Sequence, residues 1–298
     1  MRRLITTAAA LAVAATACVA GADVVPAHPN GTTSTTATDT TIQEPGTTTP
    51  ADTTDTNVSS TTTTVPSRPP GVVPADSVGE PWGEVVGLTM FRGNPTRTFY
   101  GSGPVPRSAP SVAWRFPDDA MCGQSPVGQE NKVWCGSGWT GQPVVWERPD
   151  GVTEVIFGAY DKQIHFLDAE TGERTRPDFD MGDIIKGSVT LDPDGYPLLY
   201  AGSRDPRFRI IALDGEEPYE VWSLHAKSVD GIWNDDWDSN PVIVDDIMYQ
   251  GGENSWWFAV KLNRGYDADG KVTVDPQVVY QIPAWTDELT EIFGRQHS

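Results

Sequence analysis

The densest group of polar and aromatic side chains is the stretch 233–240, which reads Trp-Asn-Asp-Asp-Trp-Asp-Ser-Asn. Carboxylate and amide oxygens are the ligands that calcium prefers, and an exposed tryptophan ring can stack on a sugar. The stretch therefore fits a calcium site or a carbohydrate site. The same residues also fit a structural use, in which the tryptophans pack between sheets and the Asp and Asn side chains close tight turns. The sequence leaves both interpretations open.

Residues of other loops are expected beside this stretch, because the expected strand order brings those loops to the same side of the fold. The candidate ligand-binding residues are Trp139, Trp233, Asp235, Asp236, Trp237, Asp238, Asn240, Glu253 and Asn254. For a metal ion, the candidate ligands are Asp236 and Asp238.

Catalytic side chains are not indicated. His165 lies in an alternating strand pattern and His225 follows another, and no Gly-x-Ser-x-Gly elbow accompanies them. The stretch 267–270, Asp-Ala-Asp-Gly, lacks the alternating acidic ligands and the twelfth-position Glu of a calcium loop, which favours a hairpin turn. We therefore assign no catalytic residue and predict a protein that binds rather than reacts.

The elements that must position these residues follow one repeated plan. Residues 157–172 indicate a strand, a polar turn, a second strand and an Asp-x-x-Thr-Gly turn, and the plan returns at 199–214 and 248–263. Asp168, Asp214 and Asn263 are equivalent, at spacings of 46 and 49 residues. A strand repeat with a period in the mid-forties is typical of propeller blades. We predict an all-β fold, a β-propeller of four-stranded antiparallel blades, with about three blades and part of another.

The strands within each blade can be placed by the same repeat. First strands are expected at 141–145, 187–191 and 239–244, and outer strands at 112–116, 219–224 and 278–282. In antiparallel order, the loops between blades share a face with the loops between second and third strands. The loops expected on that face are 136–140, 160–162, 183–186, 203–205, 234–240 and 253–254.

The repeat resembles that of the PQQ-type β-propellers, whose unit runs through Ser-Pro-Val-Val, Tyr-x-Gly-Ser, Ala-Leu-Asp-x-x-Thr-Gly and a closing Trp. The matching residues are Gly187-Ser188, Tyr200, Gly202-Ser203, Ala212-Leu213-Asp214, Asp168, Thr171-Gly172, Trp222 and the opening Phe91-Arg92-Gly93-Asn94-Pro95. More narrowly, the chain is similar to secreted or lipid-anchored actinobacterial members of the family without an assigned reaction. Members usually close a ring of about eight blades, so the three blades expected here imply a truncated product or a domain completed by another chain.

The resemblance implies two functions. One is a non-catalytic assembly scaffold, as in the lipoproteins that use this fold. The other is a dehydrogenase that uses pyrroloquinoline quinone and calcium, with two adjacent cysteines near the quinone. Cys122 and Cys135 are far from adjacent, and only Asp238 and Asn240 could be nominated for the calcium set. We therefore expect no quinone, and keep calcium open as a ligand.

The N-terminal region has a different composition. Residues 1–22 begin with two arginines and continue as an Ala-rich run, the pattern of a signal peptide, with cleavage either before a lipidated Cys18 or after Ala22. Residues 31–65 contain 17 threonines, so 23–80 is expected to be a disordered tether and 81–298 the propeller domain. The predicted location is extracytoplasmic, either anchored to the membrane through lipid or secreted.

Three cysteines and a strong negative charge complete the expectations. Because an oxidising compartment favours pairing, the simplest partition is a lipidated or removed Cys18 and a Cys122–Cys135 disulfide. Residues 81–298 carry 18 Lys and Arg against 34 Asp and Glu, a charge of −16, which disfavours a nucleic-acid partner. The predicted partner is an envelope protein or a cell-wall polysaccharide, and the oligomeric state is not predicted.

Overall fold

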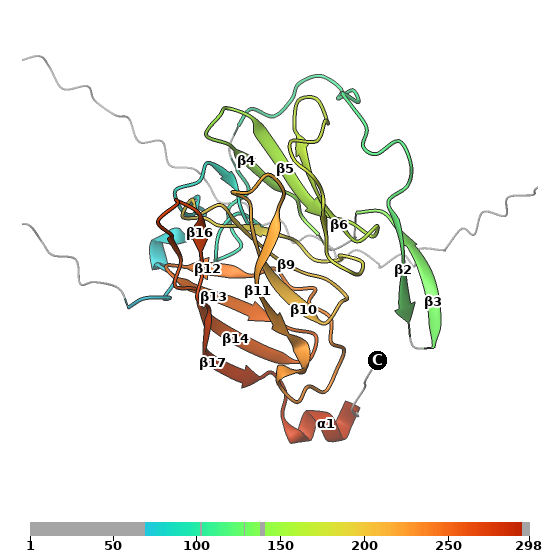
Figure 1. The fold of residues 1–298 in the computed structure, drawn as a ribbon, viewed down its shortest axis with the longest axis vertical. Coiled ribbons are helices and arrows are strands. Elements are labelled where there is room, and N and C mark those ends of the chain that lie inside the picture. The colour runs from blue at the N-terminus through green and yellow to red at the C-terminus, as the bar shows by residue number, and fades with distance from the viewer. Residues whose placement is uncertain (1–68, 102, 128, 138–140, 294–298) are drawn as a thin grey trace, which may run out of the picture. The chain divides into compact units, whose positions relative to one another are not determined.

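The computed structural model describes residues 69–101, 103–127, 129–137 and 141–293 (Figure 1). The expected signal peptide, Cys18, most of the tether and Trp139 lie outside these residues. Within the described part, no helix combines the length and the apolar character that crossing a bilayer would need.

Three antiparallel sheets form the main body, and each has the strand order of a blade. The first sheet has the order β1-β4-β5-β6-β7, with bounds Gly87–Leu88, Val144–Glu147, Thr153–Gly158, Gln163–Asp168 and Phe179–Asp180. The second sheet has the order β8-β9-β10-β11, with bounds Thr190–Leu191, Leu198–Gly202, Arg207–Ala212 and Tyr219–His225. The third sheet has the order β12-β13-β14-β17, with bounds Val242–Val244, Ile247–Gly251, Trp256–Lys261 and Gln277–Pro283.

The remaining elements are short. They are the hairpin β2–β3 (Cys122–Val127 and Glu130–Cys135), the hairpin β15–β16 (Gly265–Tyr266 and Val272–Thr273), the helix α1 (Asp287–Phe293) and the 3₁₀ turns Ala75–Ser77 and Ala226–Ser228. The expected turn at 267–270 is confirmed, because the Asp267 side chain accepts the backbone N–H groups of Asp269 and Lys271 between β15 and β16.

The predicted all-β propeller fold is confirmed by these sheets, and one expected strand is wrong. The first strands β4, β8 and β12 and the outer strands β11 and β17 lie where the repeat places them. Residues 112–116, expected as an outer strand, belong to no sheet. The Trp114 indole instead donates a hydrogen bond to the Ala169 carbonyl at 2.9 Å, so this segment is held by a side chain and not by a strand ladder.

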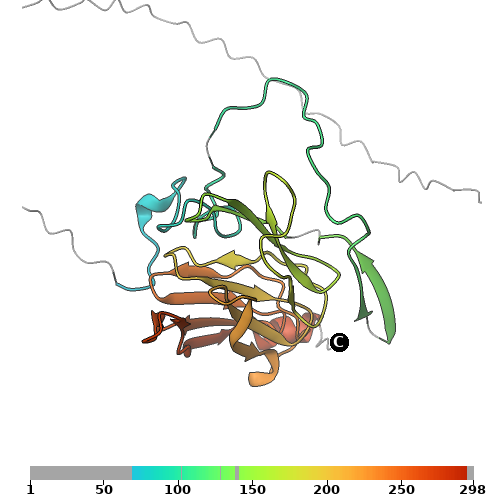
Figure 2. The same cartoon turned by 45° about the horizontal axis from the view of Figure 1, so that its top comes forward.

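The second sheet is buried on both faces, because it lies between the other two (Figure 2). In β9, all five residues are buried, although they read Leu-Leu-Tyr-Ala-Gly without polar alternation. Since successive side chains of a strand point to opposite faces, Leu199 packs with the first sheet and Tyr200 with the third. Burying one such side chain contributes about 1.5 to 3 kcal/mol.

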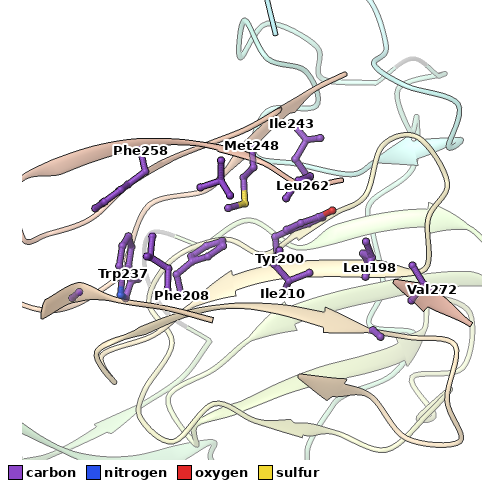
Figure 3. Packing of buried hydrophobic residues seen from close by; sticks show 14 residues of the cluster. Leu198, Tyr200, Phe208, Ile210, Trp237, Ile243, Met248, Phe258, Leu262 and Val272 are labelled. Atoms are coloured by element: carbon purple, nitrogen blue, oxygen red, sulfur yellow. The ribbon is translucent and has the colours of Figure 1, made fainter. Parts of the chain in front are cut away.

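Trp237 fills the space between the second and third sheets (Figure 3). Its ring centroid lies 5.8 Å from that of Phe208 in β10 and 5.8 Å from that of Phe258 in β14, and the side chain is fully buried. Its backbone passes so close to β9 that a Cβ on Gly202 would lie 2.3 Å from the Trp237 Cβ. Only glycine therefore fits at the end of β9.

The segment that leads into the first sheet is packed over the other sheets, upstream of the expected boundary at residue 81. The Gly71 N–H donates to Asp245 at 2.7 Å, and the Tyr249 hydroxyl donates to the Gly71 carbonyl at 2.7 Å. Asn94 is fully buried, and its amide closes the turn by bonding the Ser77 carbonyl. The packed region therefore begins earlier in the chain than the composition indicates.

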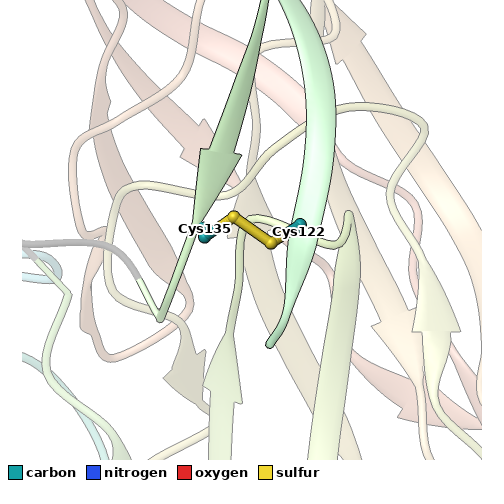
Figure 4. Close-up of a disulfide and its surroundings, with 2 residues drawn as sticks. All are labelled: Cys122 and Cys135. Carbon is teal, nitrogen blue, oxygen red and sulfur yellow. A yellow bond between two sulfur atoms is a disulfide. The ribbon is translucent and has the colours of Figure 1, made fainter. Parts of the chain in front are cut away.

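The predicted disulfide is confirmed between Cys122 and Cys135, which face each other across the hairpin β2–β3 with a Cα–Cα distance of 4.1 Å (Figure 4). The hairpin contacts loops of the first and second sheets. The Trp134 ring lies edge-on to Tyr160 at 5.8 Å, and Arg204 donates to the Pro126 carbonyl at 2.8 Å. The disulfide therefore stiffens a hairpin that the sheets support at one side.

We expect Gly202→Ala to lower the free energy of unfolding by about 3 kcal/mol, because the new Cβ would overlap Trp237 and force the sheets apart. In a thermal melt this corresponds to a decrease in Tm of about 6 to 12 °C. Gly251→Ala is the matched control, since its Cβ would meet its nearest neighbour at 3.7 Å, and its Tm should stay close to that of the wild type. An equal Tm for Gly202→Ala and Gly251→Ala would contradict the packing of Trp237 against Gly202.

Candidate functional site

Loops from all three sheets meet at one charged cluster on the predicted face. Lys186, in the connection into the second sheet, directs its ammonium group at three carboxylates. It contacts Asp238 directly, Asp236 at 3.4 Å and Glu253 at 3.7 Å. The face expected from strand order is thus the one on which these side chains meet.

A second cation, Arg204, completes the cluster. Its Nε donates to Asp236 at 2.7 Å, while its Nη1 bonds the hairpin at Pro126. The Asp236 side chain is only 6% exposed, and burial raises its pKa against the opposing effects of Arg204 and Lys186. Asp236 is therefore a buried carboxylate that is balanced by two cations.

The other two carboxylates of the cluster belong to Asp238 and Glu253. Burial and the hydrogen bond with Glu253 raise the pKa of Asp238 to about 7, although Lys186 works against this. Burial also acts to raise the pKa of Glu253. The hydrogen bond with Asp238, the charge of Lys186 and the Asn234 amide, which donates to Glu253 at 3.0 Å, outweigh burial and lower this pKa. Asp238 therefore keeps its proton to a higher pH than Glu253 does.

A polar cavity of about 210 Å³ opens beside the cluster. The residues that line it are Pro126, Asp183, Arg204, Pro206, Lys227, Asp235 and Asp236. Asp235 is partly exposed and pairs with Lys227 at 3.2 Å. Trp233, at the start of the same loop, is 42% exposed. Of the expected residues that the structure describes, Trp233 and Asp235 are thus the most exposed.

Trp237 and Asn254 do not have the exposure that ligand contact requires, so this expectation is wrong for them. Trp237 is fully buried between Phe208 and Phe258, and its ring faces are covered by the core. Asn254 is also fully buried, and its amide bonds the Ala226 carbonyl at 2.9 Å. The structural interpretation of the stretch, with tryptophan packed between blades, holds at Trp237.

Asn240 joins elements rather than facing a ligand. Its Oδ1 accepts from the Phe91 N–H at 3.0 Å and from Arg97 at 2.8 Å, and its Nδ2 donates to Thr190 at 2.7 Å. The amide thereby links the leading segment to β8. Because all these partners are distant in sequence, no local pattern could have shown this use.

Two residues of the cluster, Lys186 and Arg204, were not among the candidates, although both lie in loops expected on this face. The signal that could have found them is the charge balance of those loops. Asp236, Asp238 and Glu253 are three carboxylates expected on one face, and burying them together requires cations among their neighbours.

The carboxylates of Asp236, Asp238 and Glu253 could hold a cation, since their ligand atoms lie within 4.8 Å of one another. Calcium, however, takes six to eight oxygen ligands, and the Lys186 ammonium lies among these three. A calcium ion would have to displace that ammonium group. In the arrangement observed, the cluster is an internal ion-pair network that joins three loops, and the set does not fit the calcium of a quinone site.

No protein-family model matches this chain, and no curated protein matches it. Among solved structures, the crystal structure of BamB from Moraxella catarrhalis matches with a TM-score of 0.29 and 15% sequence identity. The match covers 50% of this chain and 56% of that chain, so it spans little more than half of BamB. The fold assignment rests on the sheets and their register.

We expect Asp238→Asn to flatten the pH dependence of stability between about pH 4 and 6.5. Unfolded Asp ionises near pH 4, whereas folded Asp238 keeps its proton to about pH 7, so the contribution of Asp238 to wild-type stability should be lost as pH rises through this window. Urea unfolding at several pH values measures this directly. Above pH 6.5 a second fall is expected, because Asp161 and Asp178 outweigh burial and raise the pKa of His165 to about 9. Identical slopes for wild type and variant below pH 6.5 would contradict the assignment.

Lys186→Met should cost about 3 kcal/mol of unfolding free energy, because it leaves three carboxylates without their central cation. Calcium should then raise the Tm of this variant more than that of the wild type, since the competing ammonium group is gone. A larger calcium effect on the wild type would instead show that the ion binds elsewhere or displaces Lys186 readily.

Proposed function

We propose that this protein is an extracytoplasmic, non-catalytic binding or scaffold protein of the PQQ-type repeat class, held at the membrane through lipid on Cys18. The observation that carries the proposal is an exposed aromatic face on the third sheet. We define the open face as the side chains of Tyr249, Trp257, Tyr280 and Ile282.

The register supports a single continuous face. Trp257 lies opposite both Gly251 and Ile282, and Ala259 lies opposite both Tyr249 and Tyr280. Residues directly opposite in antiparallel pairs point to the same side of a sheet. The Tyr249 and Trp257 rings are stacked at 5.2 Å with an interplanar angle of 14°.

The exposure of three of these side chains supports binding of a protein, while the fourth, Tyr249, is half-buried at the edge of the face, where it bonds the Gly71 carbonyl. Trp257 is 39% exposed, Tyr280 53% and Ile282 43%. Contiguous exposed apolar side chains mark interaction surfaces, and tyrosine and tryptophan dominate the energy of protein interfaces. An exposed aromatic sheet face of this kind suits another protein surface better than a small ligand, which needs a concave site.

The disulfide supports an oxidising, extracytoplasmic compartment, because such bonds persist outside the cytosol. The charge of the chain, −20, supports a partner that is not a nucleic acid.

Carbohydrate binding is a second candidate, favoured by the exposure of Trp233. This ring is 42% exposed and adjoins Asn234, which bonds Glu253 at 3.0 Å. An exposed indole beside carboxylate and amide groups suits stacking and hydrogen bonding to a sugar. The stretch first singled out in the sequence would then act through Trp233 and not through Trp237.

Photo-crosslinking tests the protein-binding proposal. A benzoyl-phenylalanine at position 280, on the full chain in its native envelope, should form adducts with a defined protein, and Trp257→Glu should reduce them several-fold. The same crosslinker at Val133, which is 63% exposed on the hairpin, is the matched control. Equal adducts at both positions would contradict a specific role for the open face.

Retention on a cell-wall polysaccharide column tests the second candidate. Trp233→Ala should abolish retention and lower the Tm much less than a change in the core, because 42% of Trp233 is exposed. Trp257→Ala serves as the control, since this exposed ring lies on the open face. Unchanged retention of Trp233→Ala would remove the carbohydrate candidate at this site.

A further inference from the structure

A glycine ends the second strand of each sheet, at Gly158 in β5, Gly202 in β9 and Gly251 in β13. At the first two, another part of the chain presses directly on the glycine. A Cβ on Gly158 would lie 2.3 Å from Ile185 Cγ2, and one on Gly202 would lie 2.3 Å from Trp237 Cβ. We use the term glycine socket for each of these glycines together with the backbone carbonyl of the next residue.

The residues that fill the first two sockets are equivalent to each other. Ile185 and Trp237 each stand two positions before the residue, Gly187 or Ser239, that opens the approach to the next sheet. Both are buried, and both donate a backbone N–H to the socket carbonyl: Ile185 to Ala159 at 3.1 Å, and Trp237 to Ser203 at 2.9 Å. One rule thus joins the first sheet to the second and the second to the third.

The third socket, at Gly251, is not pressed in this way by any described residue. A Cβ there would meet Trp257 Cδ1 at 3.7 Å and Ser239 Oγ at 3.8 Å, which are ordinary contact distances. The socket lies within the open face, because Gly251 is directly opposite Trp257 in the register. The Gly252 carbonyl is equivalent to the Ala159 carbonyl. The Ala159 carbonyl accepts the N–H groups of both Lys162 and Ile185, whereas the Gly252 carbonyl accepts the Ser255 N–H at 3.1 Å.

We propose that the open face binds a partner sheet built to the same four-stranded plan, whose leading loop inserts a bulky apolar side chain, tryptophan or isoleucine, against Gly251. The inserted residue donates its backbone N–H to the Gly252 carbonyl. The inference rests on the proposed function, since it names what the same face receives. It continues an interface that the molecule already forms twice.

The charges disfavour a second copy of this chain as the partner. They favour a different protein that carries more Lys and Arg than Asp and Glu. The folded part bears 34 acidic against 18 basic residues, so two copies repel each other. The helix α1, which directly follows β17, adds exposed carboxylates at Asp287, Glu288 and Glu291.

A peptide taken from the chain itself serves as the probe. Residues 234–244 carry Trp237, which fills the socket at Gly202, followed by the strand β12. Because these residues include three aspartates, the peptide is made with Asp235→Lys, Asp236→Lys and Asp238→Lys, which gives it the charge expected of the partner. With 5-fluorotryptophan at position 237, binding to the full chain is followed by ¹⁹F NMR. We expect a saturable shift that is lost when the peptide carries Trp237→Ser, and that weakens at least tenfold on the Gly251→Leu protein.

The variants separate docking from folding. A Cβ at position 251 would lie at ordinary contact distances from Trp257 and Ser239, so the Tm of Gly251→Leu should fall far less than that of Gly202→Ala, and Gly251→Ala is a milder variant of the same kind. Val133→Leu, on the exposed strand of the hairpin, is the matched control and should bind the peptide as the wild type does. A decrease in Tm for Gly251→Ala as large as that of Gly202→Ala would overturn the open socket.

Three results would overturn the inference. The first is equal binding of the Trp and Ser peptides, and the second is peptide binding that Gly251→Leu does not weaken. The third is a dimer in sedimentation that Gly251→Leu dissociates, because it would assign the face to a second copy. If crosslinks form at position 280 but neither they nor peptide binding respond to Gly251→Leu, the proposed function stands and the socket fails. If no crosslinks form there, the face itself is not a binding surface.

Discussion

The close approach of Trp237 to Gly202 is the contact on which the rest of this structure depends. An indole ring that is buried between Phe208 and Phe258 provides the largest single side chain of the core. It reaches that place only because β9 ends in a residue without a side chain. The hydrogen bond from Trp237 to the Ser203 carbonyl then fixes the backbone of the loop at 2.9 Å.

The charged cluster is a consequence of this anchoring. With Trp237 directed into the core, its neighbours Asp236 and Asp238 are held at the loop face, where Lys186 and Arg204 meet them. Buried carboxylates without cations would cost several kcal/mol of unfolding free energy. These ion pairs therefore mainly offset that cost and add little stability beyond it. At the opposite end of the sheets, Arg264 plays the same part, contacting Asp192 at 2.8 Å, Asp194 at 2.8 Å and Asp246 at 3.1 Å.

The open face shows what the same packing rule leaves uncovered. Each sheet presents an apolar side to the sheet that follows it, and the second sheet is buried on both sides for this reason. The third sheet has the same composition on its far side, where Tyr249 and Trp257 stack on each other. In the second sheet the equivalent side chains Tyr200 and Phe208 are covered by the third sheet, and on the third sheet Trp257 is exposed.

The sequence by itself determined the repeat, the first strands of the three sheets, two of the three expected outer strands and the face on which polar loops gather, because strand alternation and turn residues are local patterns. It also determined the pairing of Cys122 with Cys135, since few partners were available. It could not decide that Trp237 is core while Trp233 is exposed, because both are tryptophans of one loop. That difference depends on Gly202, 35 residues away, and on two phenylalanines of different sheets. Likewise, only the tertiary structure placed Lys186 and Arg204 among the carboxylates, since electrostatic balance is set by neighbours in space and not along the chain.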